Sequence, residues 1–330
     1  MGKLVESVPN YSEGRRLDVV DQLAEVVATT GGVHLLDRTS DASHNRSVLT
    51  MAGEMNAVAE ALERTIEVAI RDIDMELHTG EHPRIGAVDV IPFVPLGETT
   101  MGDCVELAQS FGARIAERFE LPVYLYAEAA RQADRIKLAD VRRGQFEGLK
   151  REIATRGRGP DFGPSRMHPR AGAVAVGARP FLIAYNINLE SADLDLARRI
   201  ARRVRESGGG LPKVQASGFM LEERGCSQVS MNLLDFGTTP MWRVWQEVRA
   251  IAREDGVELR ESELIGLAPL AALLAVADHA DAPADAPVEE RLAAAAAFLK
   301  LRDFSPLQAL ELRLAAAQAG PGGGVPRPTG

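Results

Sequence analysis

The sequence predicts an α/β (α+β) fold of two split α/β subdomains, each a mixed or antiparallel sheet covered by helices. Short apolar runs typical of strands alternate with longer amphipathic stretches that have the periodicity of helices. Glycine or proline ends several of these stretches. Both halves of the chain contain a helix, a pair of strands and another helix, which is the order expected of a split α/β unit.

The N-terminal subdomain is expected to span residues 1–165. Its first helix is an amphipathic stripe that Gly31 ends. Two strand-like runs flank the polar link at residues 42–44 and indicate a hairpin. The expected strands are residues 3–10, 33–41, 45–53, 88–95 and 121–126, and the expected helices are residues 15–32, 57–75 and 101–119.

The C-terminal subdomain is expected to span residues 166–318. Two strand pairs are predicted, with a helix after each pair and an alanine-rich helical segment, interrupted by Pro283 and Pro287, near the end. Residues 319–330 are rich in glycine and proline, a composition that predicts a disordered tail. The expected pairs are 173–179 with 181–190 and 214–223 with 227–236; the helices are 194–207 and 241–256, and the last strand is 257–266.

Basic residues accumulate between Glu128 and Arg170, where eleven lysines and arginines stand against six acidic residues. One interpretation is a solvated linker between the two subdomains. The other is a local positive lining for anionic substrates, which an acidic protein has to concentrate in one place.

The bulk composition excludes several classes of function. The net charge of -9 argues against nucleic acid as the main partner. No run of eighteen apolar residues exists, so no transmembrane helix is expected, and the N-terminus lacks the apolar core of a signal peptide. Cys104 and Cys226 form no CxxC motif and fit a reducing compartment. We therefore expect a cytoplasmic protein without membrane partners.

Several common sites are disfavoured by the spacing of their residues. His78 and His82 are four apart, as in a helical zinc motif, but Gly80 and Pro83 would break that helix, so we expect no metal site. The glycines at 208–210 follow a predicted helix and indicate its end, not a nucleotide-binding loop. No GxSxG nucleophile motif occurs.

His82 is the candidate that its context supports. Glycine and proline around it restrict the backbone, and an apolar strand follows, so the loop is attached to a rigid element. Imidazole can both accept and donate a proton near neutral pH. Glu81, Asp89 or Asp37 could orient the ring, and Arg84 could bind a substrate carboxylate bidentately. The alternative is a histidine that merely occupies a turn.

Nine segments together carry a family resemblance that runs from Val5 to about Leu314. They are VESVPNYSEG (5–14), NR (45–46), HTGEHPRIGAVDVIPFVP (78–95), LPVYLYAEAA (121–130), PDFGP (160–164), GAR (177–179), AYNINL (184–189), QVSMNLLDF (228–236) and LIGLAPLAALL (264–274). GEHPRIGAVDV is the most specific of these sequences. On these segments the chain resembles the glutamate formimidoyltransferase (formiminotransferase) family, in a stand-alone form without the cyclodeaminase domain.

The resemblance implies a transferase of histidine degradation that dimerises through its N-terminal half. Such an enzyme moves a formimino group from N-formimidoyl-L-glutamate to N5 of tetrahydrofolate, the co-substrate, and needs no metal. The family's catalytic histidine matches His82. Its folate-binding stretch matches Gly163, Pro164, Ser165, Arg166, Met167, His168, Pro169, Arg170, Ala171 and Gly172.

Two substrates have to be held together, so a substrate cleft between the subdomains is expected. Residues that could hold substrate carboxylates, or orient the reacting groups, are Arg46, Arg84, Asp37, Asn186 and Asn188. Three alternatives stay open at this point: a folate-dependent glutamate formyltransferase, a hydrolase of formimidoylglutamate, and a non-catalytic folate-binding module.

Overall fold

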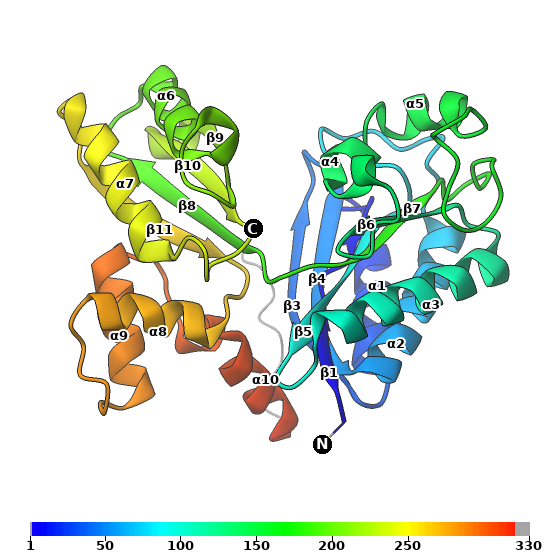
Figure 1. Cartoon of the computed structure of the whole chain (residues 1–330), viewed down its shortest axis with the longest axis horizontal. Coiled ribbons are helices and arrows are strands. Elements are labelled where there is room, and N and C mark those ends of the chain that lie inside the picture. The colour runs from blue at the N-terminus through cyan, green and yellow to red at the C-terminus, as the bar shows by residue number, and fades with distance from the viewer. Residues whose placement is uncertain (1, 321–330) are drawn as a thin grey trace. The chain divides into compact units, whose positions relative to one another are not determined.

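The computed structural model describes residues 2–320 of the chain (Figure 1). The chain forms two compact units, one ending at Arg179 and one of Pro180–Ala319. Each unit has its own sheet and its own buried core. Within the described residues, no helix is long and apolar enough to cross a membrane. The predicted class, two α/β subdomains, is confirmed.

The first unit contains a seven-stranded mixed sheet. Its strands follow the order β1-β4-β2-β5-β7-β6, with β3 paired to β4. The β3–β4 hairpin is antiparallel as predicted, whereas β7 pairs in parallel with both β5 and β6. The strands are β1 Leu4–Ser7, β2 Asn10–Tyr11, β3 Val33–Asp41, β4 Arg46–Glu54, β5 Val88–Leu96, β6 Val123–Ala127 and β7 Val174–Ala178; the long helices are α1 Leu17–Ala28, α2 Met55–Asp72 and α3 Met101–Phe119.

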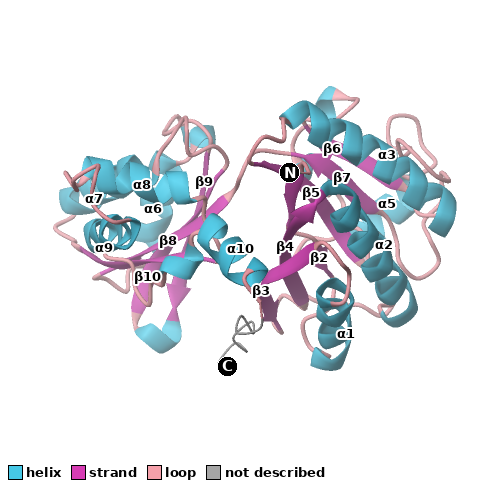
Figure 2. Cartoon of the chain, turned by 90° about the horizontal axis from the view of Figure 1, so that it is seen from below, coloured by secondary structure: helices cyan, strands magenta, loops and turns pink. Residues whose placement is uncertain are grey.

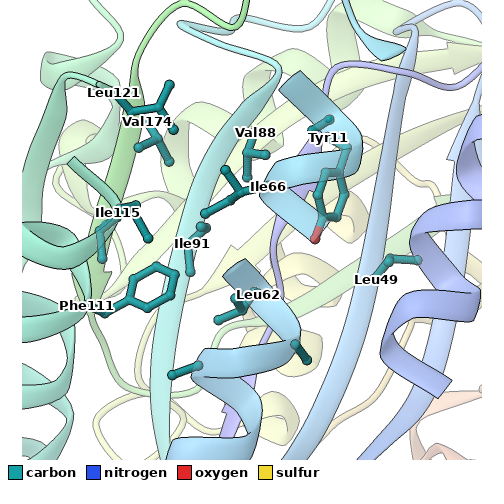
Figure 3. Close-up of a cluster of buried hydrophobic side chains, with 14 of the residues drawn as sticks. Tyr11, Leu49, Leu62, Ile66, Val88, Ile91, Phe111, Ile115, Leu121 and Val174 are labelled. Atoms are coloured by element: carbon teal, nitrogen blue, oxygen red, sulfur yellow. The ribbon is translucent and has the colours of Figure 1, made fainter. Parts of the chain in front are cut away.

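The helices α1, α2 and α3 cover one face of this sheet (Figure 2). Their apolar stripes meet the inward side chains of the strands in a core that includes Tyr11, Leu49, Ile91 and Phe111 (Figure 3). The start of α3 is fixed by a capping box, in which Thr100 Oγ1 accepts a hydrogen bond from the backbone of the third residue of the helix. Burial of these apolar stripes is the main force that holds the layers together.

The opposite face of the sheet is covered at β5, β6 and β7 by two short helices, α4 (Leu138–Val141) and α5 (Gln145–Glu152). Leu149 of α5 is fully buried in a separate cluster with Val90 and Tyr124 of the sheet. The arginine-rich segment is therefore part of the folded unit, and its interpretation as a solvated linker is wrong. A short 3₁₀ turn, Ala133–Arg135, precedes the two helices.

The second unit is an antiparallel four-stranded sheet in the order β11-β8-β10-β9. Helices α6 and α7 pack on one face, where Tyr185, Met231 and Trp245 are buried. The strands are β8 Ile183–Leu189, β9 Val214–Leu221, β10 Cys226–Leu233 and β11 Leu259–Ile265; the helices are α6 Leu194–Val204, α7 Met241–Glu254, α8 Leu270–His279, α9 Val288–Leu299 and α10 Leu310–Gln318, with 3₁₀ turns at Glu206–Gly208, Glu222–Arg224 and Pro306–Gln308.

Two expectations about the chain's organisation differ from the structure. Residues 173–179 and 181–190 do not pair: β7 joins the first sheet in parallel between β5 and β6, whereas β8 lies in the second sheet. The units therefore divide after Arg179, whereas the sequence suggested a boundary after residue 165. Residues 321–330, most of the predicted tail, lie outside the described residues.

Candidate active site

Three segments that are distant in the sequence meet beside the start of β4. They are the loop after β2, the tip of the β3–β4 hairpin and the loop that leads to β5. Ser12 Oγ donates a hydrogen bond to the Gly86 carbonyl at 2.7 Å, and the Gly14 amide donates to Asn45 Oδ1 at 3.0 Å. Asn45 Nδ2 in turn donates to the Thr79 carbonyl at 2.9 Å. These bonds fix the loop that carries both histidines against the hairpin.

Gly80 permits the close approach of the histidine loop to the hairpin. A Cβ atom at this position would lie 2.3 Å from the His44 carbonyl oxygen, which is closer than any real contact. Two residues later the chain presents His82, and the amide of Glu81 donates to the Ser43 carbonyl at 3.3 Å. The glycine therefore sets the distance between His82 and the hairpin.

His78 is engaged on both ring nitrogens. Its Nε2 donates to the Asn45 carbonyl at 3.1 Å, and its Nδ1 accepts from Arg84 Nε at 3.2 Å. Burial is the main cause that lowers the pKa of His78, and the Arg84 charge adds to the effect. The ring is thus a neutral internal link between the hairpin and Arg84, which explains one of the two closely spaced histidines.

His82 has a different environment. Its ring is half-buried, and Arg46 Nη1 lies 2.9 Å from Nε2. A guanidinium can only donate, so Nε2 accepts and the neutral ring carries its proton on Nδ1. Burial, followed by the charges of Arg46 and Arg142, lowers the pKa of His82 to about 3. At neutral pH this imidazole is an uncharged base.

The residues expected to orient His82 lie elsewhere. Asp89, which is 1 % exposed, accepts a hydrogen bond from the Ile85 amide at 2.9 Å and forms an ion pair with Arg142. Both carboxylate oxygens of Asp89 are therefore engaged by groups other than His82. Glu81 is exposed. Asp37 lies on β3 and pairs with Thr50 of β4, which is four residues further along that strand than Arg46.

Arg84 is also placed differently from the expectation. Its side chain is buried, and Glu147 accepts from both terminal nitrogens, at 3.0 Å and 2.6 Å. This bidentate pair occupies the fork that a substrate carboxylate would need. The arginine predicted to bind substrate therefore attaches α5 to the histidine loop.

The stretch 163–172 begins beside the start of β6. Phe162 pairs with Val123, and Gly163 then turns the chain with a φ of 84°, a conformation that favours glycine. The preceding Asp161 is held by a buried ion pair with Arg135 at 2.6 Å. The entry to the stretch is consequently rigid.

The end of the same stretch is hydrogen-bonded to the loop that carries His82. The Ala87 amide donates to the Ala171 carbonyl at 2.8 Å, and Gly86 and Gly172 form a β-bridge. His168 closes the turn, because its Nδ1 accepts from the Ala171 amide at 3.0 Å. The sequence-predicted folate stretch and the sequence-predicted base are thus joined by the backbone.

Arg166 and Arg170 have exposed side chains in this stretch. Arg166 pairs with Glu120 at 2.8 Å, and Arg170 pairs with Asp74 at 3.4 Å. Exposed pairs of this kind contribute little to stability and can exchange partners readily. Both side chains stay available for an anionic ligand, which remains a prediction.

Asn186 and Asn188 lie on β8 in the second unit, on the sheet face opposite the helices. Asn188 is fully buried and is held on both sides, because its Nδ2 donates to Glu261 at 3.1 Å and its Oδ1 accepts from Gln228 at 2.9 Å. Asn186 is half-buried and lies between Ser230 and Glu263 on the neighbouring strands. Of the two, Asn186 is the more accessible to a ligand.

Sequence reasoning missed two residues near His82. Arg142 follows α4 and pairs with Asp89, and the His44 ring lies 6.4 Å from the His82 ring, centroid to centroid. The excess of arginine between 128 and 170 was a signal for Arg142, although it could not identify the residue. In the part of the chain that the structure describes, no three histidine, cysteine or acidic side chains gather as a metal site would require.

Known proteins match the chain over most of its length. A family model of the N-terminal subdomain of the formiminotransferase domain matches residues 4–179, and one of the formiminotransferase domain matches residues 184–308. The chain is 44% identical to glutamate formimidoyltransferase of Streptococcus pyogenes serotype M1, covering 84% of this chain and 93% of that protein.

Two further relatives support the same family. Glutamate formimidoyltransferase of Thermoplasma acidophilum is 45% identical, with 84% of this chain and 91% of that protein covered. Formimidoyltransferase-cyclodeaminase of Sus scrofa is 46% identical, with 83% of this chain and 52% of that protein covered. With both family models and these relatives in agreement, the chain belongs to the formiminotransferase family.

Proposed function

We propose that this protein transfers the formimino group of N-formimidoyl-L-glutamate to N5 of tetrahydrofolate, giving 5-formimidoyltetrahydrofolate and L-glutamate. The names of the relatives support this activity. The observation that carries the proposal is the neutral, half-buried imidazole of His82, whose loop is hydrogen-bonded to the stretch 163–172. Tetrahydrofolate is then a co-substrate that this stretch binds.

The chemistry fits a single neutral base. N5 of the folate attacks the electrophilic formimino carbon, a tetrahedral intermediate forms, and the amine of glutamate leaves. One proton has to come off N5 and one has to reach the leaving nitrogen. His82 can accept the first on Nε2 and deliver it to the second, which is worth roughly 10²–10⁴-fold in rate.

The charges around His82 suit anionic substrates. Arg46 and Arg142 are two cations beside the ring, and Asp89 is the one carboxylate paired with them. Positioning both substrates against His82 can lower the barrier by about 7–11 kcal/mol, more than proton transfer alone. Positioning of the two substrates, and not proton transfer, therefore supplies most of the proposed acceleration.

The proposal is tested by mixing the protein with tetrahydrofolate and N-formimidoyl-L-glutamate and following the absorbance of the folate. We expect a new folate species that requires both substrates and that does not form from N-formyl-L-glutamate. Consumption of the donor without folate would indicate a hydrolase, and transfer from the formyl donor alone would indicate a formyltransferase. Folate binding without any transfer would indicate a binding module.

The expected homodimer and cytoplasmic location belong to the same proposal. They rest on the resemblance to the family and on the cysteine content of the sequence. Light scattering coupled to size-exclusion chromatography measures the oligomeric state directly. A mass of one chain, 35.6 kDa, at assay concentrations would contradict the homodimer.

A further inference from the structure

Arg46 is the arginine that contacts His82, and its guanidinium has no carboxylate partner within the described chain. Arg84 pairs with Glu147, and Arg142 pairs with Asp89. Among residues 2–320, no acidic oxygen lies within ion-pair distance of Arg46, and its side-chain hydrogen bond goes to His82 Nε2. Its side chain is half-buried, so solvent does not fully replace a counterion.

A guanidinium in this setting is suited to bind an anion. It presents five N–H donors in a planar fork that matches a carboxylate, and the imidazole occupies one of them. Partial burial removes water from the cation, which strengthens its attraction to an incoming negative charge. Burial, followed by the charge of Arg142, lowers the pKa of Arg46, and the more distant charges of Asp89 and Asp41 offset this only in part.

We propose that Arg46 binds the α-carboxylate of the amino-acid donor, and that in the empty site it covers the proton-accepting nitrogen of His82. This inference rests on the proposed function and adds to it a ligand group and a gating role. The leaving nitrogen of the donor and its α-carboxylate are attached to the same carbon. Arg46 Nη1 and His82 Nε2 are 2.9 Å apart. Arg46 can therefore bind the carboxylate while His82 contacts the leaving nitrogen.

The arrangement couples donor binding to the strength of the base. When the guanidinium turns to the carboxylate, Nε2 of His82 loses its donor and faces the reacting nitrogens. The carboxylate also neutralises the charge of Arg46, which is the largest electrostatic cause of the weak basicity of His82. The base is therefore uncovered and strengthened only when the donor is present.

Other charged groups also influence His82 and Arg46, whether or not the donor is bound. Arg142 and Asp89 form an internal ion pair that stays in place, so the change on donor binding comes from Arg46. The titratable and charged groups that act on His82 and Arg46 are His44 and Asp41 from the hairpin tip, His78 from the histidine loop, Arg142 from the segment after α4, and Asp89 from β5.

Kinetics with shortened donors test the ligand assignment. N-formimidoyl-4-aminobutyrate lacks the α-carboxylate, and N-formimidoyl-2-aminobutyrate lacks the γ-carboxylate. For the wild type, we expect loss of the α-carboxylate to lower kcat/KM about 100-fold. In Arg46→Gln this penalty should vanish while the penalty for losing the γ-carboxylate remains, and Arg46→Lys should restore part of the α-carboxylate preference.

The matched control is Arg38→Gln. Arg38 lies on the same β3–β4 hairpin, but its side chain pairs with Asp21 of α1. This variant should keep the wild-type preference among the three donors. Full α-carboxylate preference in a folded Arg46→Gln protein would overturn the assignment. Loss of the γ-carboxylate preference instead would show that Arg46 binds the other end of the donor.

NMR titration of His82 tests the coupling without any turnover. Adding L-glutamate to the wild-type protein should raise the pKa of His82 by about one unit or more, and 4-aminobutyrate should not. An unchanged pKa in saturating L-glutamate would contradict the gating role. If L-glutamate shifts the titration but no donor supports transfer, the proposed function fails while the carboxylate site stands.

Discussion

The charged cluster around His82 and the polar network of the second sheet are built from similar groups but paired differently. In the second unit, Gln228 donates to Asn188 and to Glu263, at 2.9 Å and 2.6 Å. Both carboxylates of that network are also paired with arginines: Glu261 with Arg224, and Glu263 with Arg302 at 2.8 Å. Around His82, by contrast, Arg46 is left without an acidic partner among the described residues.

The comparison separates structural from functional polar groups. A network in which the groups satisfy one another stabilises a single packing of the sheet. A half-buried cation opposite a neutral base costs stability in the empty protein and gains a partner only when an anion binds. An unpaired cation of this kind is expected at a site that handles anionic substrates, whereas Glu261 and Glu263 of the second unit are each paired with an arginine.

The largest expected effect on stability comes from removing Arg142. In Arg142→Leu, the buried carboxylate of Asp89 keeps the Ile85 amide but loses its charge partner. We expect the free energy of unfolding to fall by about 3–5 kcal/mol, because an unpaired buried charge is left behind. Denaturant unfolding measures this loss. The double variant Arg142→Leu with Asp89→Asn should recover part of it, and no recovery would contradict the pairing.

A smaller effect is expected in the second unit. Gln228→Leu removes the amide that links Asn188 to Glu263, but it leaves each carboxylate with its arginine. The free energy of unfolding should fall by about 1–3 kcal/mol, the cost of leaving a buried polar group without its partner. NMR titration should find the His82 pKa unchanged. A shift there would mean that the two polar regions are not independent.

A further expected effect concerns pH. Folding lowers the pKa of His82 from its ordinary value near 6.5 to about 3. Above pH 6.5, His82 is neutral in both the folded and the unfolded state. Below pH 6.5, the unfolded chain binds a proton at this residue and the folded protein does not, so the free energy of unfolding falls as the pH falls. The slope is at most about 1.4 kcal/mol per pH unit. His82→Gln should show a shallower fall between pH 6.5 and 4.5, and equal slopes would contradict the depressed pKa.

Much of the fold was predictable because its signals are local. The helices α1, α2 and α3 and the β3–β4 hairpin follow from hydrophobic periodicity and turn residues within each segment. The parallel pairing of β7 was not predictable, because its partners β5 and β6 are distant in sequence and nothing in residues 174–178 selects them. The short helices α4 and α5 were missed because arginine and glycine mask their few buried residues.

The site was predictable where backbone-restricting residues surround a reactive group. Gly80 and Pro83 identified the loop of His82, and the structure gives that loop a fixed place against the hairpin. The roles of the arginines were harder to predict, because a sequence does not show which acid each one meets. Arg84 finds Glu147 sixty-three residues away, and Arg46 finds none within the described chain.

The most direct test of the account is the rate of formimino transfer in a single turnover. Enzyme in excess is mixed with both substrates. The proteins compared are the wild type, His82→Gln and the control His34→Gln, whose residue lies on β3 and pairs with Ala52 of β4. We predict that His82→Gln slows transfer by roughly 10²–10⁴-fold with folate binding intact, and that His34→Gln stays near the wild type. A His82→Gln rate within tenfold of the wild type would contradict the proposal that this imidazole moves the protons.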